Sequence, residues 1–321
     1  HRYVLRGCVM AAKKRRYGAV IAGLLFGVAL GTAFDHFVLT PNIPGGNNEA
    51  NNKTVAELSN TKRQSEINQA EAQSADAYVA SVAETAVQGK LADKTVVVIR
   101  TADADKGDVD NVEWLLQKAG ATKAGEVTLK ERFLSQDGAD AVKSLVVNTL
   151  PSGAQLSSDR LDSGTHAGQA FAAGLMVPPA EGASDADEQE RSALLDAFTE
   201  GGFIDADYDA TRAADAAVIV TGDSEGVGSE SFAATNLAAF AEALKGKSKG
   251  VVVAGRIHTA APTGVIGQLR KSDRGKSVST MDSVNRAYGR LGTVLAVQEQ
   301  LDGGKGAYGA AASADAPTPG G

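Results

Sequence analysis

The sequence predicts a Rossmann-like α/β domain of three layers with a mostly parallel sheet, preceded by a transmembrane helix and a helical stalk. Between residues 94 and 308, short apolar runs rich in β-branched residues alternate with stretches of helical periodicity. Strands that are apolar along their whole length are typical of a sheet covered by helices on both faces. A charge-free stretch near the N-terminus and a long segment without Pro or Gly predict the other two parts.

The first 39 residues have the charge order of a membrane anchor. Residues 1–17 include a basic run, and residues 18–34 carry no charge. A helix over residues 18–39 would be about 33 Å long at about 1.5 Å per residue, which matches a hydrocarbon core of about 30 Å. The basic run places residues 1–17 in the cytoplasm and the rest of the chain outside it. A cleaved signal peptide has the same charge order but a shorter apolar stretch of about 7–15 residues, so we expect an uncleaved single-pass helix in the cell membrane.

Three glycines recur at every fourth position of this apolar stretch, at Gly23, Gly27 and Gly31. On a helix they share one face, where small residues allow two backbones to approach closely. This spacing favours helix–helix association, for example in a homodimer. Glycine is also common in membrane spans generally, so the spacing leaves both interpretations open.

A polar linker at residues 40–52 leads to a predicted helical stalk at residues 53–89, which contains no Pro and no Gly before Gly89. Apolar side chains form a loose heptad seam, made up of Val55, Leu58, Ala72, Val79, Ala83 and Ala86. The seam is interrupted by polar residues at Lys62, Ser65, Gln69 and Asp76, so an isolated coiled coil would be weak. We expect a stalk that pairs in a homodimer if the membrane helix holds two copies together. A solvated spacer helix is the alternative.

The α/β domain is predicted over residues 94–308. Buried strands are expected at residues 95–99, 214–220 and 250–254, with weaker strand signals at 126–129 and 276–279. Helices are expected at residues 109–116, 139–150, 165–176, 188–200, 232–244 and 285–301. Crossovers between parallel strands should be right-handed. The tail at residues 309–321 is rich in Ala, Gly and Pro and is predicted to be disordered.

Composition and motifs indicate a protein that is not an enzyme. The formal net charge is −7 and the isoelectric point is near 5.2. A nucleic-acid partner would need a basic face on the protein, so this composition argues against one. No G-x-G-x-x-G dinucleotide fingerprint and no G-x-S-x-G nucleophile elbow occur. Cys8 is the single cysteine, so no intramolecular disulfide is possible.

One loop occupies a position where open α/β sheets often bind ligands. It follows the predicted strand that ends at residue 220, and it contains Gly222, Asp223, Gly226 and Gly228. The loop therefore lies beyond the carboxyl end of a strand. Asp223 and Glu225 oppose an anionic ligand such as a phosphate. We keep a small-ligand crevice as one interpretation and an ordinary turn as the other.

The residues spell out no metal site. His166 and His258 are the histidines of the predicted domain, and no C-x-x-C, H-x-H or M-x-x-M spacing exists. Asp103, Asp105 and Asp108 lack the remaining ligands of a calcium loop. We therefore predict no resident cofactor.

An ordered set of short segments resembles the actinobacterial MctB family, which is named for copper transport. The similar segments lie at residues 147–149, 151–157, 162–168, 220–222, 254–256, 279–282, 289–290, 295–296 and 303–309. The order of membrane helix, helical stalk and α/β domain is also similar. The resemblance implies an extracytoplasmic domain, a role in copper homeostasis or efflux, and copper as the associated metal.

Two functions follow from the resemblance and the residues together. The first is copper transport or homeostasis at the cell envelope. The second is a membrane-anchored interaction or scaffold module, with a stalk-mediated dimer, that regulates cell-wall hydrolysis and daughter-cell separation through an envelope protein partner. Some members of the family resemble such partners in cell separation.

Overall fold

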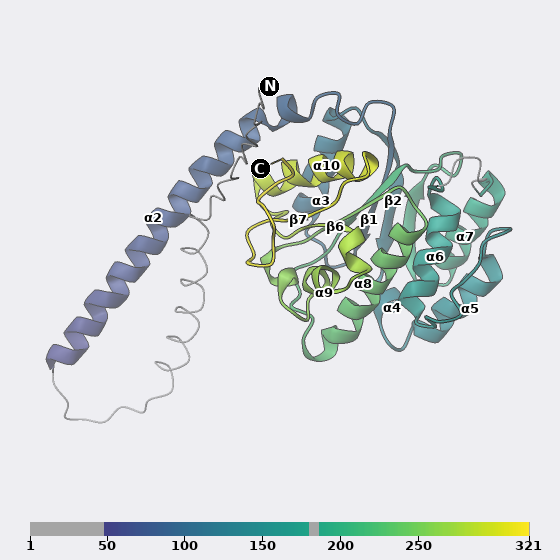
Figure 1. Cartoon of the computed structure of the whole chain (residues 1–321). Coiled ribbons are helices and arrows are strands. Elements are labelled where there is room, and N and C mark those ends of the chain that lie inside the picture. Colours follow the sequence, from purple (N-terminus) through teal and green to yellow (C-terminus); the bar gives the residue numbers. More distant parts are fainter. Residues whose placement is uncertain (1–47, 180–185, 321) are drawn as a thin grey trace, which may run out of the picture. The chain divides into compact units, whose positions relative to one another are not determined.

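The computed structural model describes residues 48–179 and 186–320 (Figure 1). The predicted N-terminal segment 1–17 and membrane helix 18–39, with Gly23, Gly27 and Gly31, lie outside the described residues, as does most of the linker. Within the described part of the chain, no helix combines the length and the apolarity that a membrane span needs.

The described residues form a seven-stranded sheet in the order β3-β2-β1-β4-β5-β6-β7. All neighbouring pairs are parallel except β2 and β3. The strands are β1 (Thr95–Thr101), β2 (Thr122–Leu129), β3 (Ile204–Tyr208), β4 (Ala216–Val220), β5 (Gly250–Ala254), β6 (Ser279–Met281) and β7 (Ala307–Tyr308). The prediction of an α/β fold with a mostly parallel sheet is confirmed.

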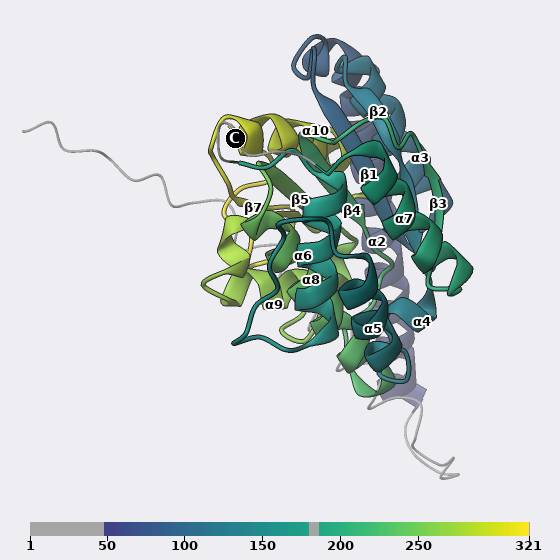
Figure 2. The ribbon, with the colours of Figure 1, turned by 90° about the vertical axis from the view of Figure 1, so that its right-hand side faces the viewer.

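Helices cover both faces of the sheet, which gives the three expected layers (Figures 1 and 2). One face packs against α4 (Glu131–Leu134), α5 (Ala139–Thr149), α6 (Ser163–Leu175), α7 (Glu188–Glu200), α8 (Ser231–Gly246) and α9 (Val265–Lys271). The other face packs against α3 (Lys106–Lys118), α10 (Ala287–Leu301) and the end of α2 (Asn48–Val87). Because β1, β4 and β5 are central, their side chains alternate between two buried layers. This double burial explains their continuous apolar sequences.

The local sequence defines several helix starts. Asp105, Asp162 and Asp187 each accept a hydrogen bond from the backbone N–H three residues later, at distances of 3.1, 2.7 and 2.8 Å. Such caps satisfy a donor that has no partner inside the helix. At α7 the side chain of Glu190 also accepts from the N–H of Asp187, which completes a capping box.

Two strands and two short helices were not predicted from the sequence, and one of these helices is α4 at Glu131–Leu134. In β3 burial alternates along Ile204–Tyr208, because this strand is at the sheet edge and one of its faces is exposed. β7 has two residues, too few to produce a pattern. β6 lies at Ser279–Met281, three residues later than the strand expected at 276–279, because a 3-10 turn occupies Gly275–Ser277. The short helix α9 was not anticipated.

The tail is not the disordered segment that its composition predicts. Residue 308 pairs with Ala316, and the N–H of Gly309 donates to the carbonyl of Ala316 at 3.0 Å. The buried Asp282 accepts from the N–H of Ala310 at 2.8 Å and from Arg270 Nη1 at 2.8 Å. At Gly309 a Cβ would lie 2.1 Å from an Asp282 carboxylate oxygen, so only glycine allows this approach. A distant, buried charge pair therefore orders a segment of low complexity.

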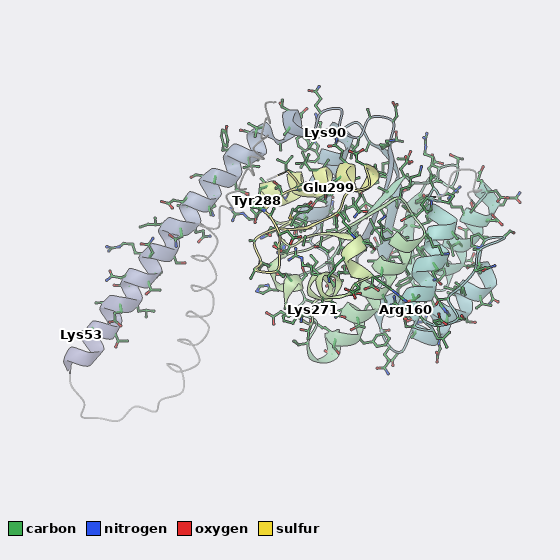
Figure 3. All side chains as sticks on the ribbon, viewed as in Figure 1. Lys53, Lys90, Arg160, Lys271, Tyr288 and Glu299 are labelled. Carbon is green, nitrogen blue, oxygen red and sulfur yellow. The ribbon has the colours of Figure 1, made fainter. Side chains whose placement is uncertain are left out.

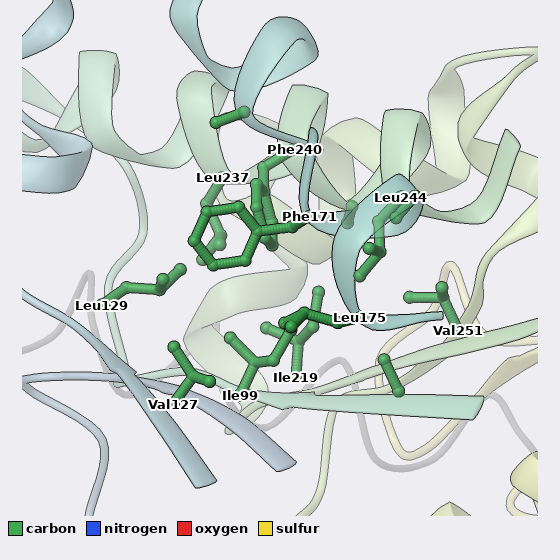
Figure 4. Packing of buried hydrophobic residues seen from close by; sticks show 14 of the residues in the cluster. Ile99, Val127, Leu129, Phe171, Leu175, Ile219, Leu237, Phe240, Leu244 and Val251 are labelled. Atoms are coloured by element: carbon green, nitrogen blue, oxygen red, sulfur yellow. The ribbon is translucent and has the colours of Figure 1, made fainter. Parts of the chain in front are cut away.

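The core on the α6 and α8 side of the sheet is built around four phenylalanines that are fully buried, two of which, Phe171 and Phe240, are labelled in Figure 4. The ring centroids of Phe133, Phe171, Phe198 and Phe240 lie 5.2 to 5.9 Å apart in edge-to-face or tilted arrangements. Such pairs contribute beyond the area that they bury. The cluster joins α4, α6, α7 and α8, so it holds this helical layer together.

We predict that Phe171→Ala lowers the free energy of unfolding by about 3–5 kcal/mol, because it leaves a cavity among three other rings. Urea denaturation followed by circular dichroism measures the loss. Val147→Ala is the control, since the Val147 side chain is 65% exposed and its loss should change stability by no more than about 0.5 kcal/mol. A Phe171→Ala variant as stable as this control would contradict the assignment of the core.

Candidate functional site

The carboxyl ends of β1, β4 and β5 meet at one edge of the sheet, where three loops converge. The chain order reverses between β1 and β4, since β1 pairs with β2 on one side and with β4 on the other. Ligands of open α/β sheets bind in the crevice outside such a switch point. The segment at residues 221–228 that the sequence singled out lies there, and we call it the crevice loop.

The crevice loop is packed against the loop that follows β1. The N–H of Gly222 donates to Thr101 Oγ1 at 3.1 Å. A Cβ at Gly222 would lie 2.1 Å from Asp103 Oδ2, so this glycine allows the close approach of the two loops. Gly226 and Gly228 have φ angles of +68° and +60°, in the left-handed region that favours glycine. The structure therefore gives the predicted glycines a role in shaping the loop.

Asp223 forms an ion pair with a histidine from another loop. His258 Nδ1 lies 2.9 Å from Asp223 Oδ2. This hydrogen bond raises the pKa of His258, while partial burial opposes the rise. The two residues are 35 positions apart in the sequence, so no local spacing could have indicated their contact. Parallel neighbours β4 and β5 bring them together.

An open cleft of about 730 Å³ lies beside the crevice loop. Its lining combines hydroxyls with carboxylates, from Thr101, Asp103, Glu131, Ser135, Asp137, Thr221, Ser224, Ser229 and Glu230. Ser224 Oγ donates to the Glu230 carboxylate. The side chains that line this described cleft include no Lys, Arg or His. The cleft is therefore unsuited to a phosphate, as the acidic crevice loop led us to expect.

A nearly buried carboxylate joins the crevice to α10. Asp108 on α3 accepts from Arg256 Nε at 2.8 Å and lies 3.5 Å from Arg290 Nη2. Arg256 Nη2 also lies 3.1 Å from Asp105 Oδ2. The bond to Asp108 raises the pKa of Arg256, and the N–H of Asp108 lowers the pKa of Asp105. Asp105 and Asp108 are thus paired with arginines and a helix start, which is a structural use of both carboxylates.

The soft side chains of the domain are occupied or buried. His166 Nε2 lies 3.1 Å from the carbonyl of Ser157, far in sequence from the His258 pair. Met176 and Met281 are 1% and 0% exposed. In the part of the chain that the structure describes, no three His, Cys, Asp or Glu side chains are grouped so that they could hold a metal ion.

The predicted stalk coincides with α2, which begins at Asn48 inside the expected linker and ends at Val87. Its seam divides into two parts. Val55 and Leu58 are exposed, at 66% and 70%. Ala72 and Val79 are half-buried, and Ala83 is buried. Apart from Ala86, which is exposed, the second part of the seam packs within the chain, a use that the heptad pattern did not indicate.

Asp76 accounts for the difference between the expected and the observed seam. Its Oδ1 accepts from the N–H of Ala287 at 2.7 Å, so α2 supplies an acceptor to the first turn of α10. Arg286 Nη2 donates to the carbonyl of Ala72 at 2.7 Å, and Arg286 Nε lies 3.4 Å from Asp76 Oδ1. Tyr288 of the same turn lies nearby (Figure 3), and burial raises its pKa. The polar gap at Asp76 is therefore a contact with α10.

Comparison with known proteins identifies similar chains over nearly the whole length. The family described as "Copper transport outer membrane protein, MctB" matches residues 14–319. Copper transporter MctB of Mycobacterium tuberculosis (strain ATCC 25618 / H37Rv) is 29% identical over 297 residues, which cover 91% of this chain and 92% of the relative. The protein of the same name from Mycobacterium leprae (strain TN) is 32% identical over 233 residues, which cover 70% and 72%.

We predict that His258 titrates above its ordinary pKa of about 6.5 and that Asp223→Asn lowers this pKa. Because the pKa of His258 is higher in the folded than in the unfolded chain, the pair stabilises the fold fully at pH values below the unfolded pKa. This contribution is lost as the pH rises through the folded pKa. Histidine proton shifts followed by NMR against pH measure the titration. Asp196→Asn on α7 is the matched control, and an equal shift in both variants would refute the pairing.

Proposed function

The chain belongs to the MctB family, and on this premise we propose that it is a membrane-anchored, non-enzymatic protein of the cell envelope that contributes to copper homeostasis. Family membership over most of the chain is the observation that carries the proposal. The basic run and the apolar residues 18–39 support the anchor. They also support an orientation with the N-terminus in the cytoplasm and the α/β domain outside it.

Copper would be the cargo of the system in which the protein acts. A copper(I) site favours thiolate, thioether and imidazole ligands. Within the described domain, Met176 and Met281 are buried, each histidine has one ring nitrogen engaged, by Ser157 or by Asp223, and no three His, Cys, Asp or Glu side chains are grouped. We therefore propose that the α/β domain acts through an envelope partner, and that copper ligation within this domain is not required.

We predict that a strain lacking the protein loses copper tolerance and that the wild-type chain restores it. A quadruple variant, His166→Ala, His258→Ala, Met176→Leu and Met281→Leu, should restore it equally, because it removes the soft ligands while nearly conserving the core volume. Growth against copper concentration and cellular copper content measure both effects. Unaltered tolerance and copper content in the deletion strain would overturn the copper proposal. Failure of a folded quadruple variant would show that the domain ligates copper.

The exposed part of α2 favours a second function, an interaction or scaffold module. Residues 55–71 of this helix are exposed at every position, and Val55, Leu58 and Ile67 present large apolar side chains there. Together with the glycine face at Gly23, Gly27 and Gly31, this surface supports a homodimer through the membrane helix and the stalk. The dimer would engage an envelope protein partner and regulate cell-wall hydrolysis and daughter-cell separation.

For this second function, we predict that deletion of residues 54–67, which are two heptads, abolishes normal cell separation while the α/β domain remains folded. The deletion ends ahead of Ala72, where contacts with α10 begin. Microscopy of the complemented deletion strain and the thermal melting of the purified chain measure the two effects. The matched control replaces the same residues by a polar helix of equal length. Full complementation by the deletion would refute the role of this section of α2. Complementation by the control but not by the deletion would show that the section acts only as a spacer of fixed length.

A further inference from the structure

We propose that one section of the α2 seam is a latch for which α10 of the same chain and α2 of a second copy compete. The latch consists of Ala72, Asp76 and Val79 on α2 and of Arg286 and Ala287 on α10. This inference rests on the stalk pairing proposed above. Beyond that pairing, we infer that the section from Ala72 to Val79 is covered in a single copy, and that its contact with the start of α10 must open before two copies can pair.

The latch lies on the same helix face as the rest of the seam. Heptad spacing from Val55 and Leu58 passes through Lys62, Ser65 and Gln69 to Ala72, Asp76 and Val79. In the structure the last three are half-buried, and Ala72 and Asp76 contact Arg286 and Ala287 at the start of α10, whereas Lys62, Ser65 and Gln69 are exposed. A second α2 that followed this seam would therefore meet α10 at Ala72.

The uncovered section is too polar to pair by itself. From Val55 to Gln69 the seam offers two apolar side chains, Val55 and Leu58, and three polar ones. Short helical pairs need apolar residues in successive heptads, because nucleation and the loss of conformational freedom must be offset. Stable pairing therefore needs the next heptad, which contains Ala72 and Val79. Both are half-buried in the single copy.

The latch is a small and polar contact. It consists of one hydrogen bond from the N–H of Ala287 to Asp76, one from Arg286 to the carbonyl of Ala72, and a partly exposed ion pair. Arg286 Nε is buried without a hydrogen-bond partner, although it lies 3.4 Å from Asp76 Oδ1. The covered state thus leaves a polar atom unsatisfied, which lowers the cost of opening it.

Apolar burial begins just beyond the latch. Ala83, Val87 and Leu91 are 3%, 0% and 0% exposed and belong to the core beneath α3 and α10. If these residues stay in place, α2 must bend between Val79 and Ala83 for the section from Ala72 to Val79 to separate from α10. The latch can open without unfolding the domain, and the base of α2 remains anchored.

Asp76 favours the closed latch over the pair. In the closed state its carboxylate accepts from the first turn of α10, where the helix dipole favours a negative charge. In a parallel pair the same position would bring two carboxylates together in the seam, which is unfavourable. One residue therefore stabilises the single copy and opposes pairing. A membrane anchor that raises the local concentration of α2 would shift the balance toward the pair.

The test uses the full-length chain in detergent, in a Cys8→Ser background, with two readouts. Sedimentation equilibrium measures pairing. Spin labels at Ala70→Cys on the exposed side of α2 and at Asp302→Cys on the domain measure the distance across the latch by pulsed electron resonance. Excess unlabelled chain suppresses distances between copies. Arg286→Gln is the decisive variant, because it weakens the latch and leaves every seam residue unchanged.

We expect Arg286→Gln and Asp76→Leu each to broaden the distance distribution and to tighten pairing at least tenfold. Lys62→Leu, outside the latch, should tighten pairing and broaden the distribution only at concentrations where copies pair. Ser74→Leu, on the exposed face away from the seam, should change neither readout. Because Asp76→Leu acts from the other helix, it serves as the test if Arg286→Gln fails to fold.

Two results overturn the competition and leave stalk pairing intact. In the first, Arg286→Gln broadens the distance distribution but leaves pairing unchanged, while Lys62→Leu tightens pairing. In the second, copies pair while the distance distribution stays narrow. If neither Lys62→Leu nor Asp76→Leu tightens pairing, the stalk pairing proposed above is itself wrong, and the latch competition falls with it.

Discussion

Burial of the central strands on both faces is the constraint on which the rest of this structure depends. β1, β4 and β5 expose almost none of their side chains, so the sheet needs a helical layer on each side. One layer is assembled around four phenylalanine rings. The other contains α3, α10 and the end of α2. Val87 is thereby drawn into the core, and the stalk becomes a continuation of the folded domain.

The same arrangement concentrates charge at the carboxyl ends of the parallel strands. Loops from β1, β4 and β5 end at a common edge, where Asp105 and Asp108 pair with Arg256 and Arg290, and Asp223 binds His258. These pairs connect α3, α10 and the crevice loop. Arg286, the N-cap of α10, contacts α2, and Arg290, four residues later on α10, lies beside Asp108. The crevice and the stalk thus share one structural support.

Family membership and structure bear on different parts of the function. Membership in the MctB family associates the protein with copper transport. The described domain has buried methionines and histidines that each engage one ring nitrogen, together with a helix that is exposed from residue 55 to residue 71. An envelope protein that serves copper homeostasis through partners unites both sets of observations. In this view the α/β domain positions the stalk, and the acidic cleft excludes anionic ligands from the crevice.

The sequence by itself determined the α/β class, the central strands and the long stalk helix, because periodicity and apolar runs reflect local geometry and burial. It also located the crevice loop, since position after a strand is a topological property. Only the tertiary structure decided the edge strand β3, the ordered tail and the roles of Asp76 and Asp223. Each of these depends on a partner distant in the chain, Ala287 for Asp76 and His258 for Asp223. Composition and spacing carry no information about such partners, because folding alone brings them within hydrogen-bonding distance.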